Sequence, residues 1–220
     1  MDGFVLQEGA AVTDVVTPPS TRRGRAKADR REALLTAAAA LFAERGFNGV
    51  SIEDLGAAAG VSGPALYRHF SSKQAVLAAL LVGVSENLLS GGQAVVERSA
   101  DAATALSELV AFHVDFALGN PEVIRVQDRD LDSLDAAERR AVRALQRRYV
   151  ELWVEVLGRL HPGVDDALLR IRAQATFGLI NSTPHSATFE GSRARRGKAI
   201  PIGTVRALLE EMALATLAPR

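Results

Sequence analysis

The sequence predicts an all-α protein in which a small N-terminal three-helix domain precedes a larger helical domain. Apolar residues recur every three to four positions along most of the chain, as on the buried face of a helix. No segment shows the sustained two-residue alternation of a β-strand. Residues 48–73 carry the signals of two short helices joined by a tight turn, which is the pattern of a helix-turn-helix.

Composition is that of an ordinary globular protein, but the charge is unevenly distributed. The 220 residues include 26 Lys or Arg, 26 Asp or Glu and no cysteine, which excludes disulfides and thiolate metal sites. No apolar run approaches the roughly 20 residues of a membrane span, and no signal-peptide pattern opens the chain, so a cytoplasmic location fits. Residues 17–75 hold nine Lys or Arg against five Asp or Glu. Positive charge at this end suits a surface that attracts phosphates.

The N-terminal part divides into a tail, a basic arm and a helix. Residues 1–21 lack periodicity and end in Thr-Pro-Pro-Ser-Thr, so we expect them to be disordered. The basic arm contains Arg22, Arg23, Arg25 and Lys27. It either solubilises the chain or follows a phosphate backbone or minor groove, and the neighbouring helix-turn-helix favours the second interpretation. A helix over 29–45, ended by Gly46, completes the N-terminal core.

Capping signals define the two helices of the helix-turn-helix. Ser51 and Asp54 form an S-x-x-D capping box, and Gly60 suits the left-handed conformation that follows a helix end. Ser62 caps the second helix, predicted over 62–70, with Pro64 in its first turn. The apolar residues at helical spacing are Ile52, Leu55, Ala59, Val61, Leu66 and Phe70. The outward side of the second helix then carries Gly63, Pro64, Ala65, Tyr67, Arg68 and His69.

A long helix from Ser71 or Ser72 to about Leu89 links the two parts of the chain. The following Ser-Gly-Gly, residues 90–92, is expected to interrupt or end it. Beyond this point, caps and stops predict helices over 101–118, 121–131, 135–160, 165–182 and 204–217. The predicted domains are therefore a helix-turn-helix domain with its arm at 22–75 and a helical domain at 76–220.

The helix-turn-helix segment resembles one known family. The run Gly46-Phe47-(x)3-Ser51-Ile52-(x)2-Leu55-(x)4-Gly60-Val61-Ser62-(x)3-Leu66-Tyr67-Arg68-His69-Phe70-(x)2-Lys73 is similar to the DNA-binding domain of the tetracycline-repressor (TetR) family. The similarity covers about 29–80 and departs from the family at Gly56, where alanine is more usual.

The resemblance implies a homodimeric, ligand-responsive transcriptional regulator, a repressor in preference to an activator, without a cofactor. Its second helix would lie in the major groove of a palindromic operator, Lys73 would pair with a phosphate, and the last two helices would form a four-helix dimer interface. The implied DNA-contacting residues are Arg25, Ser51, Ser62, Gly63, Pro64, Ala65, Tyr67, Arg68, His69 and Lys73.

The middle helices would enclose the effector, and their composition suits an apolar ligand with one polar end. The candidate ligand-binding residues are Phe112, Phe116, Tyr149, Trp153, Phe177, Asn181 and His185. The polar cluster at 181–186 either caps a helix end or forms a wall of the pocket or a dimer contact. A faint similarity of the C-terminal half to TetR-like regulators of lipid metabolism favours a fatty-acyl effector such as an acyl-CoA, with a drug-like aromatic compound as the alternative.

Other function classes were weighed against this one. The four histidines are scattered without metal-ligand spacing, and no acid, base and nucleophile are assembled, so neither an enzyme nor a metal site is expected. An architectural or activating DNA-binding protein without an effector is the remaining alternative. A basic loop containing Arg193, Arg195, Arg196 and Lys198 is either solvated or returns to the DNA-binding end.

Overall fold

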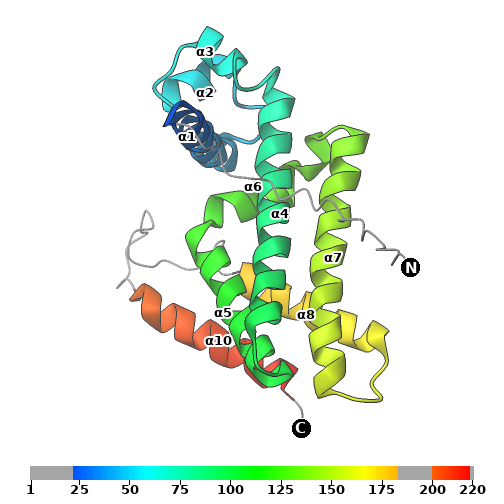
Figure 1. Ribbon diagram of the computed structural model, residues 1–220. Coiled ribbons are helices and arrows are strands. Elements are labelled where there is room, and N and C mark those ends of the chain that lie inside the picture. Colours follow the sequence, from blue (N-terminus) through cyan, green and yellow to red (C-terminus); the bar gives the residue numbers. More distant parts are fainter. Residues whose placement is uncertain (1–21, 183–199, 219–220) are drawn as a thin grey trace, which may run out of the picture.

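A computed structural model describes residues 22–182 and 200–218 of the chain. These residues form helices and connecting turns without a strand, which confirms the predicted all-α class. The long helix α4 connects the group α1–α3 at one end of the molecule with the helices at the other end (Figure 1). The predicted tail at 1–21, the candidate ligand residue His185 and the basic loop at 193–198 lie outside the described residues.

The N-terminal group contains α1 (Arg22–Arg45), α2 (Ile52–Ala58) and α3 (Gly63–Tyr67). Gly46 and Gly60 have positive φ angles of 76° and 66°, so both end a helix as predicted. The start predicted for the first helix is wrong, because α1 begins at Arg22 and the basic arm forms its first turns. Arg25 and Lys27 are exposed there. Residues 25 and 27–33 are all exposed, and apolar periodicity can detect only helices that have a buried face.

The core of the N-terminal group also includes parts of the later helices. Leu34, Phe42, Leu55, Leu66 and Phe70 pack together from α1–α3 and the turn after α3. The first half of α4 (Lys73–Arg98) adds a row of apolar residues, and α6 (Pro121–Asp130) adds two more. The additional core residues are Val76, Leu77, Ala78, Leu80, Leu81, Val123 and Val126. The N-terminal core is therefore built on α4 and α6 as well as on α1–α3.

Helix α4 does not end at the glycine pair. It continues to Arg98, so the predicted interruption at 90–92 is wrong. A Cβ added to Gly91 would lie 2.4 Å from Cζ of Phe112, and one added to Gly92 would lie 2.7 Å from Cε2 of Tyr149. The glycines therefore allow α5 and α7 to approach α4 closely, at the usual cost of glycine inside a helix.

The C-terminal helices are α5 (Ala102–Gly119), α6, a 3-10 turn (Leu131–Ser133), α7 (Ala136–Leu160), α8 (Asp166–Asn181) and α10 (Ile202–Leu217). The cap predicted at Asp135 is confirmed, and Asp101 and Asp165, the first residues of two predicted helix ranges, are caps as well. Asp101 accepts a hydrogen bond from the backbone N–H of Thr104 at 2.8 Å, and Asp135 and Asp165 cap α7 and α8 in the same way. Helix α10 packs against α5 and α8, and α7 runs beside α4 (Figure 1).

A second core joins the C-terminal half of α4 to α5, α7, α8 and α10. Trp153, Leu109, Leu157, Leu169 and Leu217 are among its completely buried residues. By length and composition alone, α4 and α5 pass as membrane spans, although no membrane span was predicted from the sequence. Buried helices of a folded core pass the same test, and 44% of each apolar window is buried inside this protein, so the indication is weak.

Candidate nucleic-acid interface and ligand pocket

Hydrogen bonds around Ser51 and Gly60 fix the geometry of the helix-turn-helix. Oγ of Ser51 accepts from the backbone N–H of Asp54 at 3.0 Å, and Oδ2 of Asp54 accepts from the backbone N–H of Ser51 at 2.9 Å. The hydroxyl of Ser51 also donates to Oδ2 of Asp54 at 2.7 Å, and this bond, followed by the one from the Ser51 backbone N–H, holds the pKa of Asp54 below its ordinary value. After α2, the N–H groups of Gly60 and Val61 donate to the carbonyls of Ala57 and Gly56. This pair of bonds is the Schellman motif, and it sets the angle at which α3 leaves α2.

The surface around α3 differs in part from the predicted outward side. Leu66 and Phe70 are buried and anchor α3, while Pro64 and Arg68 are exposed and the Tyr67 side chain is 55% exposed. The helix ends at Tyr67, so the range predicted for it, 62–70, is too long.

Three other predicted DNA-contacting residues have specific local surroundings. Arg68 and His69 lie in the turn before α4, where the backbone N–H of His69 donates to the carbonyl of Leu66 at 2.8 Å. His69 is only partly exposed. Ser62 occupies the N-cap position of α3, but its side chain makes no capping hydrogen bond there.

Lys73 contacts the chain itself rather than projecting freely. Its Nζ donates to the carbonyls of Phe47 and Val50, at 2.8 and 2.7 Å, and lies 4.4 Å from the centroid of the Phe47 ring. The ammonium thus fastens the loop before α2 to the start of α4. Two of its three protons are used in this way, so one is left for the phosphate contact, which stays a prediction.

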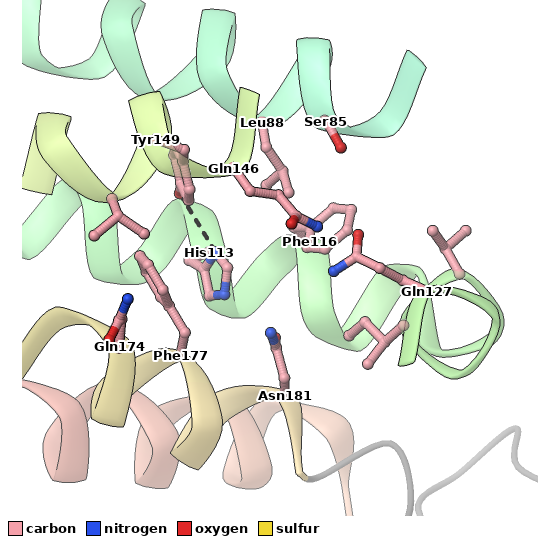
Figure 2. Close-up of a pocket in the computed structure, with 13 residues that line it drawn as sticks. Ser85, Leu88, His113, Phe116, Gln127, Gln146, Tyr149, Gln174, Phe177 and Asn181 are labelled. Carbon is pink, nitrogen blue, oxygen red and sulfur yellow. Dashed lines mark hydrogen bonds between the residues drawn. The ribbon is translucent and has the colours of Figure 1, made fainter. Parts of the chain in front are cut away.

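A pocket lies between the helices of the C-terminal half, with a volume of about 260 Å³. It is lined by Ser85, Leu88, His113, Phe116, Val123, Ile124, Gln127, Gln146, Tyr149, Val150, Gln174, Phe177 and Asn181. These residues come from five helices, α4 to α8, and their side chains converge on one space (Figure 2). Such a site between helices is a usual position for a small-molecule ligand.

The structure brings four of the seven predicted ligand-binding residues to this pocket: Phe116, Tyr149, Phe177 and Asn181. Two others do not line it. Trp153 is completely buried and supports the rings of Tyr149 and Phe177 at centroid distances of 6.2 and 4.9 Å. Phe112 lies against Gly91 of α4 instead. Aromatic composition alone does not tell a ring that lines a cavity from one that packs behind it.

Five polar pocket residues were not predicted: Ser85, His113, Gln127, Gln146 and Gln174. A signal for three of them was present in the sequence. His113 comes three positions before Phe116, Gln146 three before Tyr149, and Gln174 three before Phe177. Residues at this spacing share a helix face. Each of these polar residues could therefore have been predicted to line the pocket from the aromatic residue three positions after it.

His113 is the most deeply placed polar residue of the pocket. Its side chain is 3% exposed, and its Nδ1 lies 3.3 Å from the hydroxyl of Tyr149. Burial lowers the pKa of His113 to about 4, although the neighbouring Asn181 amide acts in the opposite direction. Burial also raises the pKa of the Tyr149 phenol. Both groups are therefore neutral at neutral pH, and none of the other lining residues carries a charge.

Helix α6 connects the pocket with α1. Val123, Ile124 and Gln127 line the pocket, and one turn further on the guanidinium of Arg129 donates to the carbonyls of Phe42 and Ala43. Arg129 also pairs with the Asp130 carboxylate at 3.0 Å, and this carboxylate is only 8% exposed. Both carbonyls belong to the last turn of α1, and that of Phe42 also accepts from the backbone N–H of Gly46 at 2.8 Å. One short helix thus touches both the pocket and the N-terminal core.

Exposed apolar side chains gather on the last two helices. They are Leu168 and Ile171 on α8 and Leu208 and Met212 on α10, each at least 44% exposed. The two helices pack against each other. No group of three or more His, Cys, Asp or Glu in the described part of the chain could hold a metal ion.

Comparisons with known proteins cover both halves of the chain. A family model described as bacterial regulatory proteins of the tetR family matches residues 34–80, and one described as a tetracyclin repressor-like C-terminal domain matches residues 99–185. The HTH-type transcriptional repressor KstR2 of Rhodococcus jostii (strain RHA1) is 30% identical over 171 residues, which is 76% of this chain and 82% of the relative.

Solved structures resemble the chain over most of its length. A TetR-family transcriptional regulator from Bordetella parapertussis 12822 has a TM-score of 0.71 at 26% identity and covers 85% of this chain and 93% of its own. AibR, solved with isovaleryl coenzyme A and operator DNA, has a TM-score of 0.67 at 18% identity. The match covers 87% of this chain and 100% of the AibR chain. At that identity the likeness to AibR concerns the fold.

Proposed function

Because the chain belongs to the TetR family of DNA-binding transcriptional regulators, we propose that it is a repressor that leaves its operator when a small hydrophobic effector binds. The observation that carries the proposal is the pocket of α4–α8, whose walls continue into the DNA-binding core. Ser85 and Leu88 of α4 line the pocket, while Val76 and Leu81 of the same helix pack under α1–α3. Helix α6 makes the second connection through Arg129.

On the DNA side, α3 would enter the major groove with Pro64 and Tyr67 outward and Arg68 beside it. Gly63 and Ala65, being small, would let the backbone come close to the DNA, and Arg25 at the exposed start of α1 would reach phosphate. The predicted contacts of Ser51, Ser62 and His69 are part of the same proposal. One helix of this length reads only a few base pairs, so two copies on a palindromic operator are required, with half-sites about 34–36 Å apart or a multiple of that.

The dimer would form through the exposed apolar residues of α8 and α10, with each helix pair packing on its symmetry mate. A stable interface of this kind buries at least about 1,000 Å². Membership of this family of DNA-binding regulators also supports a cytoplasmic location.

For the effector, we propose a hydrophobic molecule of the acyl-CoA type. Leu88, Phe116, Ile124 and Phe177 provide apolar contacts. A cavity of about 260 Å³ is near the lower end of the usual range for ligand pockets, so it would take the acyl part and leave the nucleotide outside. AibR, which shares the fold, was solved with isovaleryl coenzyme A, and this supports the ligand class without deciding it.

Effector binding would act by favouring one of two positions of α4 and α6 and so changing the spacing of the two recognition helices. A ligand can do this only through its difference in affinity between the two states. A hundredfold weakening of DNA binding needs about 2.7 kcal/mol of coupling free energy.

The test begins with selection of bound fragments from genomic DNA, followed by footprinting of the best site. A palindromic footprint that acyl-CoAs release at tens of micromolar or less supports the proposal. A footprint that only another ligand class releases rejects the acyl-CoA part and leaves the repressor. If no small molecule releases it, or if the bound protein raises transcription in a reporter, the architectural or activating alternative replaces the repressor.

A further inference from the structure

The pocket contains more neutral hydrogen-bonding groups than a plain acyl chain requires. Seven of its lining side chains can donate or accept a hydrogen bond: Ser85, His113, Gln127, Gln146, Tyr149, Gln174 and Asn181. They come from all five of the helices that form the pocket, α4 to α8. A saturated hydrocarbon chain among them would remove water from these groups and offer nothing in exchange, which is costly.

His113 is the group whose hydrogen bonding is least complete. Its Nδ1 faces the Tyr149 hydroxyl, whereas its buried Nε2 makes no hydrogen bond of normal length and angle with a described residue, although the side chain of Asn181 lies close enough to raise the pKa of His113. Oδ1 of Asn181 is likewise buried without a hydrogen bond of normal geometry to a described residue. Figure 2 shows the ring of His113 between Tyr149 and Asn181. With the Tyr149 hydroxyl donating to Nδ1, the ring proton is on Nε2, which then presents a donor to the pocket.

The same residues exclude a charged ligand end. Since burial lowers the pKa of His113 to about 4, the ring is neutral at neutral pH and cannot balance a carboxylate. None of the thirteen lining residues is Asp, Glu, Lys or Arg. A carboxylate or phosphate placed here would lose its hydration without gaining an ionic partner. The groups that fit are therefore uncharged oxygens.

Building on the proposed function, we infer that the buried part of the effector is an uncharged lipophile with at least two carbonyl or hydroxyl oxygens. One oxygen accepts a hydrogen bond from Nε2 of His113. A second binds the amides of Gln127 and Gln146, which point into the pocket from α6 and α7 (Figure 2). Within the acyl-CoA class, this selects acyl groups that carry a keto or hydroxyl oxygen in addition to the thioester, and it excludes free fatty acids.

Three probes with the same carbon chain test the ligand class on the wild-type protein: a decanedione with its ketones near the two ends, the matching methyl ketone decanone, and decanoate. Isothermal titration calorimetry measures their dissociation constants. Each neutral hydrogen bond contributes a factor of about three to ten, so the dione should bind up to about tenfold tighter than decanone. Decanoate should bind more weakly than either. Binding of decanoate equal to or tighter than that of the dione would overturn the inference.

The role of His113 is tested with His113→Phe, which keeps a ring in the cluster but removes both nitrogens. The dione and decanone should then bind with nearly equal affinity, because only the glutamine site remains. Trp153→Phe is the matched control, since it alters the same ring cluster without removing a group that lines the pocket, and it should preserve the preference for the dione. A purely structural role of His113 would weaken both probes equally and leave the ratio unchanged, which contradicts the assignment.

The proposed repressor function and the inferred ligand class can be refuted independently of each other. Operator binding by the wild-type protein tests the proposed function without any probe. If the protein binds no operator but prefers the dione, the repressor proposal falls and the ligand class stands. If it binds an operator and prefers decanoate, the ligand class falls and the repressor stands. The wild-type probe series gives this answer even if His113→Phe does not fold.

Discussion

Replacing Arg129 with methionine should separate effector binding from operator release. Methionine keeps the length and apolar stem of the side chain, but it removes the hydrogen bonds to the carbonyls of Phe42 and Ala43. It also leaves the Asp130 carboxylate, which is 8% exposed, without this partner. The direct contact of α6 with the end of α1 would then rest on apolar packing alone.

The expected loss of stability follows from these contacts. A hydrogen bond from a charged donor contributes about 1.5–3 kcal/mol when it is buried. Because the Arg129 side chain is 45% exposed, solvent reduces this, and about 2 kcal/mol is expected for the two carbonyl contacts together. The unpaired Asp130 adds to the loss. For a chain of this size the melting temperature should fall by about 4–8 °C.

Two measurements then decide the role of Arg129. An acyl-CoA that weakens operator binding of the wild-type protein a hundredfold should weaken that of Arg129→Met only about tenfold or less. The affinity of the variant for this acyl-CoA should change little. Adding Asp130→Asn removes the unpaired charge, so it should restore part of the stability but not the operator release. Hydrogen exchange of the amides at 42–50 provides a readout without effector and should speed up. A variant with normal release and normal exchange would refute transmission through Arg129.

Three further predictions concern single sites. Lys73→Met should lower the melting temperature, because it releases the loop before α2; a fall of about one unit in the salt slope of DNA binding without loss of stability would instead support a phosphate contact. Leu208→Glu should give monomers in analytical ultracentrifugation and abolish operator binding, whereas Leu208→Ala should only weaken the dimer; a dimeric Leu208→Glu protein would contradict the proposed interface. Finally, the pKa of His113 is lowered in the folded state from 6.5 to about 4, so its contribution to stability is complete above pH 6.5 and is lost as the pH falls towards 4. Denaturant titrations should show a loss of about 3 kcal/mol over this window that is absent in His113→Phe.

The sequence predicted those parts of the fold that local chemistry determines. Capping by Ser51 and Asp135 depends on neighbours within three residues, so both caps could be predicted from the sequence. The left-handed conformation of Gly60 is equally local. The start of α1 was missed for a physical reason, because residues 25 and 27–33 are all exposed and offer no apolar stripe to detect.

The contacts at the candidate sites that the sequence did not predict involve partners that are distant in the sequence. Lys73 comes directly after the helix-turn-helix, and its position there suggests an exposed cation. In the structure its ammonium donates to carbonyls 23 and 26 residues earlier in the chain. The pocket shows the same limitation. Phe116, Tyr149, Phe177 and Asn181 could be proposed from composition, but only packing shows that Trp153 lies behind them and that α6 contributes Gln127.

The glycine pair of α4 tests whether close helix packing outweighs the low helix propensity of glycine. Alanine at an unconstrained helical glycine should stabilise the protein by about 0.5–1 kcal/mol. Gly83→Ala should do so, because a Cβ there meets no atom within 4 Å. Gly92→Ala in the same helix would place its Cβ 2.7 Å from the ring of Tyr149 and 3.0 Å from Cδ2 of Leu152, so α4 and α7 must separate or the pocket ring must move. We expect this variant to lose about 1–3 kcal/mol in denaturant titrations and to bind the effector more weakly. If Gly92→Ala stabilises the protein as much as Gly83→Ala does, the close approach of α4 and α7 is not what keeps glycine at this position.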